Sequence, residues 1–153
     1  GNIRYAGLIG GKRKLDLLSR AKALIYPTNW DEPCAVAPLE ALACGTPVIA
    51  SANGCMPELV RPGTGIICHT YDELLAAPER LEKEVTPENC RKAVEEFFSA
   101  RRMAQDYLAL IDQILKKGEL DHEPRYAFRP DSVQLLYKPT LINRLRHAVL
   151  GKV

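Results

Sequence analysis

Long apolar stretches are absent from this sequence of 153 residues. No run reaches the roughly 18 consecutive apolar residues that a bilayer-spanning helix needs, so a membrane span is not expected. A large excess of one sign of charge is also absent, since the net charge is only +2. A nucleic-acid partner is therefore not expected, since phosphate backbones are bound by clustered basic faces.

Paired cysteines are absent as well. The five cysteines stand at 34, 44, 55, 68 and 90, and no two of them form a Cys-x-x-Cys pair. Disulfide frameworks and zinc sites need closer spacings, so no metal site is expected. We interpret the cysteines as reduced thiols of a cytoplasmic protein, mostly buried, with Cys44 and Cys68 in the core.

Two common nucleotide-binding motifs are missing. The run Gly7-Leu8-Ile9-Gly10-Gly11 does not fit Gly-x-Gly-x-x-Gly, and no P-loop is present. A nicotinamide-dependent dehydrogenase is therefore disfavoured. The sequence does contain enough apolar residues, 46% against 26% charged, to predict a packed domain.

Short apolar runs alternate with helical patterns over the first 70 residues. Strands are predicted at 3–6, 23–26, 48–50 and 65–68, and helices at 12–21, 35–44 and 57–60. This order is typical of a parallel sheet with crossover helices, and the continuous apolar strands indicate that both faces are covered. The predicted fold class is therefore α/β, a Rossmann-like parallel sheet with flanking helices.

The rest of the chain is predicted to be helical and then irregular. Helices are expected at 71–75, 87–98 and 99–117, and the apolar stripe of the last is expected to dock on the sheet domain. We predict one domain over 1–118 and, over 119–153, a linker followed by a short amphipathic helix at 141–149. The basic side of that helix suggests at most a weak membrane-surface association.

Two glutamates give the main indication of function. Glu32 falls in the loop after a predicted parallel strand, where open α/β sheets bind ligands, and Glu40 falls one and a half turns into the next helix. A carboxylate among apolar neighbours needs hydrogen-bond donors, and a sugar diol supplies two. The amides of Cys34, Ala35 and Val36 open the helix and would suit an anion such as a diphosphate.

The segment around these glutamates resembles glycosyltransferase family 4 of the two-domain GT-B class. The matching residues include Glu32-Pro33, Glu40-Ala41, Gly45, Pro47-Val48-Ile49 and Pro57-Glu58-Leu59-Val60. The resemblance covers roughly residues 3 to 117. It implies a partial C-terminal donor-binding domain with a helical C-terminal extension, whose N-terminal acceptor domain is absent from this chain.

The resemblance also implies roles for individual residues. Glu32 would contact the donor sugar as the catalytic residue, Glu40 would hold the ribose, and the amides of Cys34, Ala35 and Val36 would contact the distal phosphate and sugar. Gly7, Leu8 and Ile9 would lie against the base. The partner is a nucleoside diphosphate sugar, no metal or other cofactor is required, and the anomeric configuration is retained.

Two departures from the family pattern leave alternatives open. Cys34-Ala35 replaces an aromatic-glycine pair, so the phosphate loop is expected to be altered. The family's diphosphate-clamping Arg and Lys would precede residue 1. A non-catalytic remnant that binds nucleotide sugars, or a nucleotide-sugar epimerase of the same architecture, are the alternative functions. Lys12, Arg13 and Lys14 could reach a phosphate, but a solvated helix start is favoured.

Overall fold

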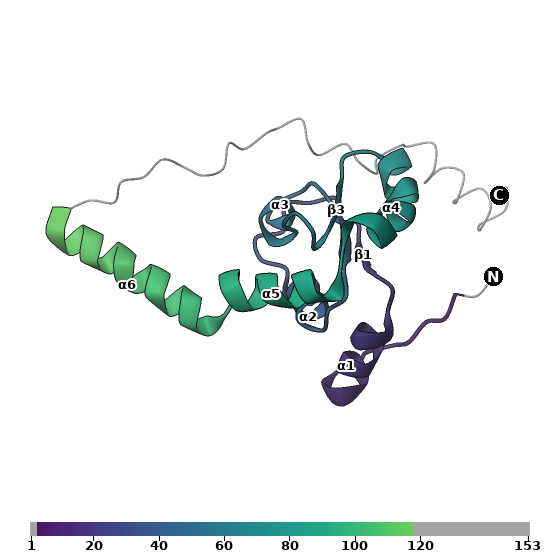
Figure 1. Ribbon diagram of the computed structural model, residues 1–153, viewed down its shortest axis with the longest axis horizontal. Coiled ribbons are helices and arrows are strands. Elements are labelled where there is room, and N and C mark those ends of the chain that lie inside the picture. The colour runs from purple at the N-terminus through teal and green to yellow at the C-terminus, as the bar shows by residue number, and fades with distance from the viewer. Residues whose placement is uncertain (1–2, 118–153) are drawn as a thin grey trace, which may run out of the picture.

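The structure is a computed structural model that describes residues 3–117 (Figure 1). The predicted linker at 119–153 and the predicted helix at 141–149 lie outside these residues. The domain boundary at residue 118 therefore stays a prediction.

A three-stranded parallel sheet forms the centre of the molecule. Its strands β1 (Leu24–Tyr26), β2 (Val48–Ser51) and β3 (Gly65–Cys68) stand in the order β1-β2-β3. Ile25 pairs with Ile49, and Ile49 with Ile66, so β2 is the middle strand and β1 lies at an edge. The predicted α/β class with a Rossmann-like parallel sheet is confirmed.

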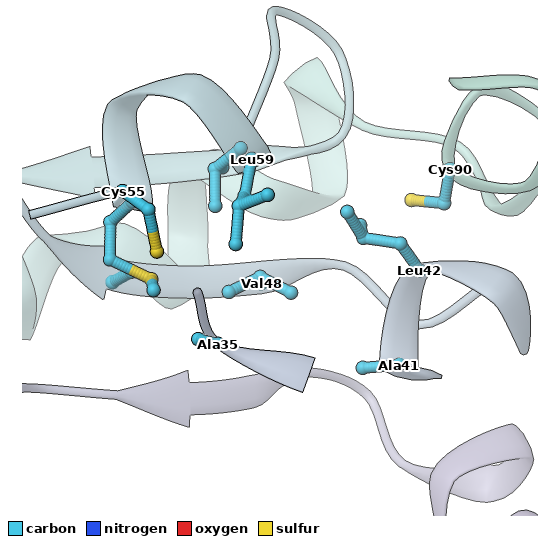
Figure 2. Packing of buried hydrophobic residues seen from close by; sticks show 10 residues of the cluster. Ala35, Ala41, Leu42, Val48, Cys55, Leu59 and Cys90 are labelled. Atoms are coloured by element: carbon cyan, nitrogen blue, oxygen red, sulfur yellow. The ribbon is translucent and has the colours of Figure 1, made fainter. Parts of the chain in front are cut away.

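Helices cover both faces of the sheet. Successive side chains of each strand point to opposite sides, so apolar residues of one strand pack against helices on both faces. Val48 and Ala50 of β2 pack in one cluster with α2 (Val36–Ala43), α3 (Met56–Leu59) and α5 (Pro87–Phe97), as Figure 2 shows. Ile49 points the other way and packs against α4 (Tyr71–Glu84). Four consecutive buried residues in β2 follow directly from this double cover.

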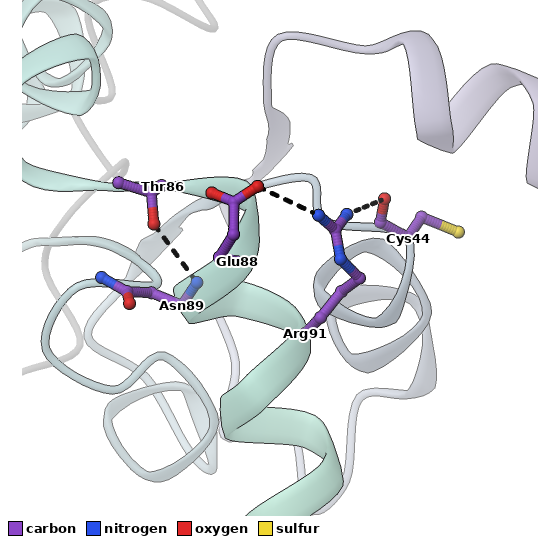
Figure 3. Close-up of polar contacts among 5 residues, drawn as sticks. All are labelled: Cys44, Thr86, Glu88, Asn89 and Arg91. Atoms are coloured by element: carbon purple, nitrogen blue, oxygen red, sulfur yellow. Dashed lines mark hydrogen bonds and ion pairs between the residues drawn. The ribbon is translucent and has the colours of Figure 1, made fainter.

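The start of α5 is fixed to the end of α2, far away in the sequence. Thr86 caps α5 by accepting a hydrogen bond from the amide of Asn89 (Figure 3). Arg91 then donates to the carbonyl oxygen of Cys44, the residue that follows α2. Next to it, Gly45 has a φ of +82° and lets the Arg91 guanidinium lie against the backbone. The positive φ of Gly45, directly after the C-cap residue Cys44, is the glycine conformation that commonly ends a helix.

Three predictions about the elements are wrong. Residues 3–6 form no strand: they are exposed and pair with no described strand. The helix predicted at 71–75 continues as α4 to Glu84, through Pro78. Burial of Ala77 and Leu81 against the sheet offsets the hydrogen bond that the proline removes.

The third correction concerns α6 (Ala100–Lys117), which has the predicted extent but not the predicted packing. Figure 1 shows it extending away from the sheet. Its stripe is solvent-exposed, with 61% of Tyr107 and 50% of Ile111 accessible. The stripe therefore does not dock on the sheet domain.

The remaining cysteine and helix predictions hold with small shifts. α1 (Gly11–Arg20) lies beside α2, and its Leu18 packs at the margin of the larger core. Cys68 is fully buried as predicted, whereas Cys44 is only partly buried.

Candidate functional site

The candidate site lies where the carboxyl ends of the strands meet. The loop 27–35 leaves β1 there, and the segment 52–55 leaves β2 beside it. Because β1 and β2 are parallel neighbours, the two loops emerge at the same edge of the sheet. Glu32 sits in the first loop, and α2 with Glu40 follows it.

Four hydrogen bonds hold the first loop on the second. The carbonyl oxygen of Thr28 accepts from Ser51 Oγ and from Asn53 Nδ2, the latter at 2.7 Å. Further along, the amide of Gly54 donates to Asp31 Oδ1 at 3.0 Å. The amide of Cys55 donates to the carbonyl oxygen of Glu32 at 2.8 Å. The backbone position of Glu32 is therefore set by the neighbouring strand as well as by its own.

Gly54 makes this contact sterically feasible. Its φ is +54°, and a Cβ at this position would lie 2.4 Å from both the backbone nitrogen and the backbone oxygen of Glu32. A side chain would separate the loops, so the Asn53-Gly54 pair is an anchor for Glu32 in addition to being a turn. Asn53 itself is fully buried, and its Oδ1 has no hydrogen-bond partner among the described residues.

The Glu32 carboxylate is partly buried and has one protein donor in the described structure. Tyr26 Oη donates to Glu32 Oε2 over 3.4 Å, from the last residue of β1. Burial raises the pKa of Tyr26, and the negative charge of Glu32 raises it further, so the phenol stays protonated and available as a donor. Glu32 Oε1 stays free to accept hydrogen bonds from a ligand.

The N-terminus of α2 opens between the two glutamates. The helix starts at Val36, and no side chain caps it. Ala35 stands at the N-cap position with φ −88° and is buried, whereas Cys34 and Val36 are exposed. The negative φ is one that alanine adopts without strain, and an altered phosphate loop stays a prediction. The first amides of the helix are the donors that an anion would use.

Glu40 forms an ion pair that the sequence reasoning missed. Lys14 Nζ of α1 lies 2.5 Å from Glu40 Oε1, and both side chains are about one-third exposed. The interpretation of Lys14 as part of a solvated helix start is therefore wrong for this residue. Glu40 Oε2 and two of the three ammonium protons of Lys14 stay available, because the pair uses one acceptor and one donor.

The proposed base contacts are not brought together with the glutamates. Gly7 and Leu8 are exposed and Ile9 is half-buried, in the extended segment before α1. No described hydrogen bond joins them to Glu32 or Glu40. Within residues 3–117, no three His, Cys, Asp or Glu side chains gather closely enough to hold a metal ion. Metal-independent chemistry stays a prediction.

Among the helices of residues 3–117, none combines the length and the apolar character needed to cross a bilayer.

Comparison with known proteins adds independent information. The family model "Glycosyl transferases group 1" matches residues 1–97. Glycogen synthase of Mycobacterium tuberculosis (strain ATCC 25618 / H37Rv) is 33% identical over 134 residues, which cover 80% of this chain and 31% of that protein. Spore coat protein SA of Bacillus subtilis (strain 168) is 27% identical over 108 residues, 63% of this chain and 28% of that protein.

One solved structure is similar in fold and in sequence. It is the crystal structure of AviGT4, a glycosyltransferase involved in avilamycin A biosynthesis, with a TM-score of 0.59 and 28% identity. The match covers 71% of this chain and 35% of that one. The chain thus spans about a third of the length of the relatives it matches.

Proposed function

The chain belongs to the group 1 glycosyl transferases, and on this premise we propose that it is the donor-binding part of a family 4 glycosyltransferase of the GT-B class. Such an enzyme would transfer a glycosyl group from a nucleoside diphosphate sugar to an acceptor and retain the anomeric configuration. We assign catalysis to the complete enzyme, in which an N-terminal acceptor domain faces this one. We further propose a cytoplasmic location; membrane-surface contact through residues 141–149 stays a prediction.

The open N-terminus of α2 supports the placement of the diphosphate. Free amides and the positive end of the helix dipole together favour an anion. The amides of Cys34 and Val36 would contact the distal phosphate and the sugar, and both residues are exposed. Ala35 is buried and its amide lies against the Cys55 thiol, so that amide is not free for a ligand.

The two glutamates support the placement of the sugars. Glu40 lies in α2 with Oε2 open, and it would accept hydrogen bonds from the ribose hydroxyls. Glu32, anchored through Gly54 and Cys55, would accept from the donor sugar hydroxyls. Lys14 would stay paired with Glu40 and direct a second N–H towards the nucleotide.

In the transfer step, the bond between the anomeric carbon and the diphosphate oxygen breaks and its electron pair leaves with the diphosphate. The acceptor oxygen bonds to the anomeric carbon on the same face and passes its proton to the departing diphosphate oxygen. The developing charge on the diphosphate would be stabilised by the α2 amides, as an oxyanion is by oriented donors. Glu32 would fix the sugar orientation during this step.

The observation that supports the proposal is that the start of α2, between Glu32 and Glu40 in the sequence, has no side-chain cap and follows a loop at the carboxyl edge of the sheet. Isothermal titration with UDP, GDP, ADP and their glucose and mannose conjugates tests it. We expect one diphosphate to bind, and Glu40→Gln to weaken that binding at least about tenfold. Glu32→Gln should weaken only the nucleotide sugar.

Glu79→Gln is the matched control, because Glu79 is an exposed carboxylate in α4, outside the motif and the candidate site. Absence of binding for every nucleotide, or unchanged binding by the Glu40 variant, would contradict the proposal. Product analysis on the longer parent enzyme separates the alternatives. An epimerised donor formed without acceptor would indicate an epimerase, and donor binding without any turnover would indicate a non-catalytic remnant.

A further inference from the structure

A hollow lies at the opposite end of the sheet from the glutamates. Its volume is about 250 Å³, slightly below the roughly 300 Å³ at which small-molecule sites begin. Thr64, in its floor, immediately precedes β3, and the Thr64 carbonyl accepts from the amide of Val48 at the start of β2. The hollow is therefore at the amino edge. The hollow is lined by Arg61, Pro62, Thr64, Asn89, Lys92, Ala93, Glu96 and Phe97.

The floor is a tight turn at residues 61–64. The Arg61 carbonyl accepts from the amide of Thr64 at 3.0 Å and from Thr64 Oγ1 at 2.8 Å. Gly63 has a φ of +79°, and a Cβ there would lie 3.3 Å from Asn89 Nδ2, so the amide group of Asn89 lies against the turn. Because Thr64 is buried, the floor is held by the core.

The wall is one face of α5. The lining residues of α5 lie on one side of the helix, because they are related by spacings of three and four residues. They are Asn89, Lys92, Ala93, Glu96 and Phe97. The same helix is held to the core by buried Cys90 and Ala93. Its polar side chains therefore project into the hollow from a fixed element.

The hollow contains two cationic groups that the described ion pairs leave unused. The Arg61 guanidinium carbon lies 3.8 Å from the centroid of the Phe97 ring, so the planar group stacks on the aromatic face. Stacking occupies the face of the guanidinium and leaves its N–H edge open. Neither Arg61 nor Lys92 is among the residues that form ion pairs within 3–117, whereas neighbouring Arg91 pairs with Glu88.

We propose that this hollow binds a small organic phosphate that carries hydroxyl groups. The N–H edge of Arg61 matches phosphate oxygens, Lys92 adds a second positive charge, and the Asn89 amide adds a neutral donor. The Glu96 carboxylate disfavours a bare anion and accepts from a hydroxyl group, so it selects a phosphate ester of a polyol. This site is independent of the donor site proposed above, because the two lie at opposite ends of the strands.

Titration of the full 153-residue chain with glycerol 3-phosphate, followed through its amide resonances by two-dimensional NMR, tests the proposal. We expect saturable shifts confined to residues 61–64 and α5. Arg61→Gln should weaken binding at least about tenfold and Lys92→Gln about fivefold, since each removes a charged hydrogen bond. Inorganic phosphate should bind more weakly than glycerol 3-phosphate, and glycerol should cause no shifts.

Arg101→Gln is the matched control, because Arg101 is an exposed cation on α6, outside the hollow. Lys92 is exposed, so its replacement leaves the fold intact even if Arg61→Gln lowers stability. The proposal is overturned if the shifts scatter over the surface, if Lys92→Gln binds as the unmodified chain does, or if inorganic phosphate binds as tightly as glycerol 3-phosphate.

Discussion

Gly54 is the single residue on which the position of Glu32 most directly depends. Replacement by alanine imposes a positive φ on a residue with a side chain and brings the new Cβ within 2.4 Å of the Glu32 backbone. We expect Gly54→Ala to lower the free energy of unfolding by roughly 2 to 4 kcal/mol, measured by urea denaturation.

Gly10→Ala is the control for this experiment, because a Cβ there meets nothing within 4 Å and φ is −146°. It should change stability by less than about 1 kcal/mol. Equal losses for the two variants would show that the contact between the two loops does not hold the site.

The site residues could be predicted from the sequence only where they lie close together in it. Glu32, Glu40 and the helix end between them lie within a single stretch, so their spacing was informative. The ion pair between Lys14 and Glu40 joins residues 26 positions apart and depends on how α1 packs on α2. Likewise, Asn53-Gly54 reads as a turn, but its contact with Asp31 and Glu32 appears only when two loops meet at the sheet edge.

At the scale of elements, burial distinguishes helices that have similar sequence patterns. Leu42 of α2 is fully buried, whereas Leu115 of α6 is 80% exposed. We expect Leu42→Ala to cost about 2 to 5 kcal/mol of unfolding free energy and Leu115→Ala less than about 0.5 kcal/mol. Chemical denaturation of the two variants measures the difference. A comparable loss at Leu115 would mean that α6 is covered in solution.

Element boundaries were predictable where the local chemistry is decisive. Thr86-Pro87 gave the start of α5, and Gly45 gave the end of α2, because a cap and a positive φ act locally. The extent of α4 was not predictable from its own residues, since Pro78 argues against a helix that packing nevertheless sustains. The apolar stripe of α6 does not by itself show whether it packs against the sheet or faces solvent.

For the whole molecule, the α/β class followed from the alternation of apolar runs and helical patterns. Strand order and double cover then follow from short crossovers between parallel strands. Residues 3–6 have the composition of a strand, but a strand also needs a partner. Sequence alone does not show whether one is available.

Buried thiols in both core clusters make the stability of the whole molecule sensitive to alkaline pH. Burial raises the pKa of Cys55, Cys68 and Cys90, that of Cys90 to about 11. Above the pKa of the unfolded thiol, about 9, the unfolded chain loses a proton that the folded chain keeps. Stability is therefore fully present below about pH 9 and falls as pH rises towards 11, by up to about 3 kcal/mol for Cys90.

Urea denaturation at pH 8, 9, 10 and 10.5 measures this decline. Cys90→Ala should show a shallower slope, and Cys34→Ala, which changes an exposed thiol, should show the original one. A slope that is the same for all three proteins would exclude Cys90 as a cause.

The edge position of β1 has a consequence for the behaviour of this chain in solution. No described strand pairs with the outer side of β1, and 56% of Ile25 is accessible there. An unpaired row of amides and carbonyls beside an apolar side chain is a template for strand addition. A strand supplied by another polypeptide would extend the sheet beyond that border, and the three residues of β1 limit how much of it could pair.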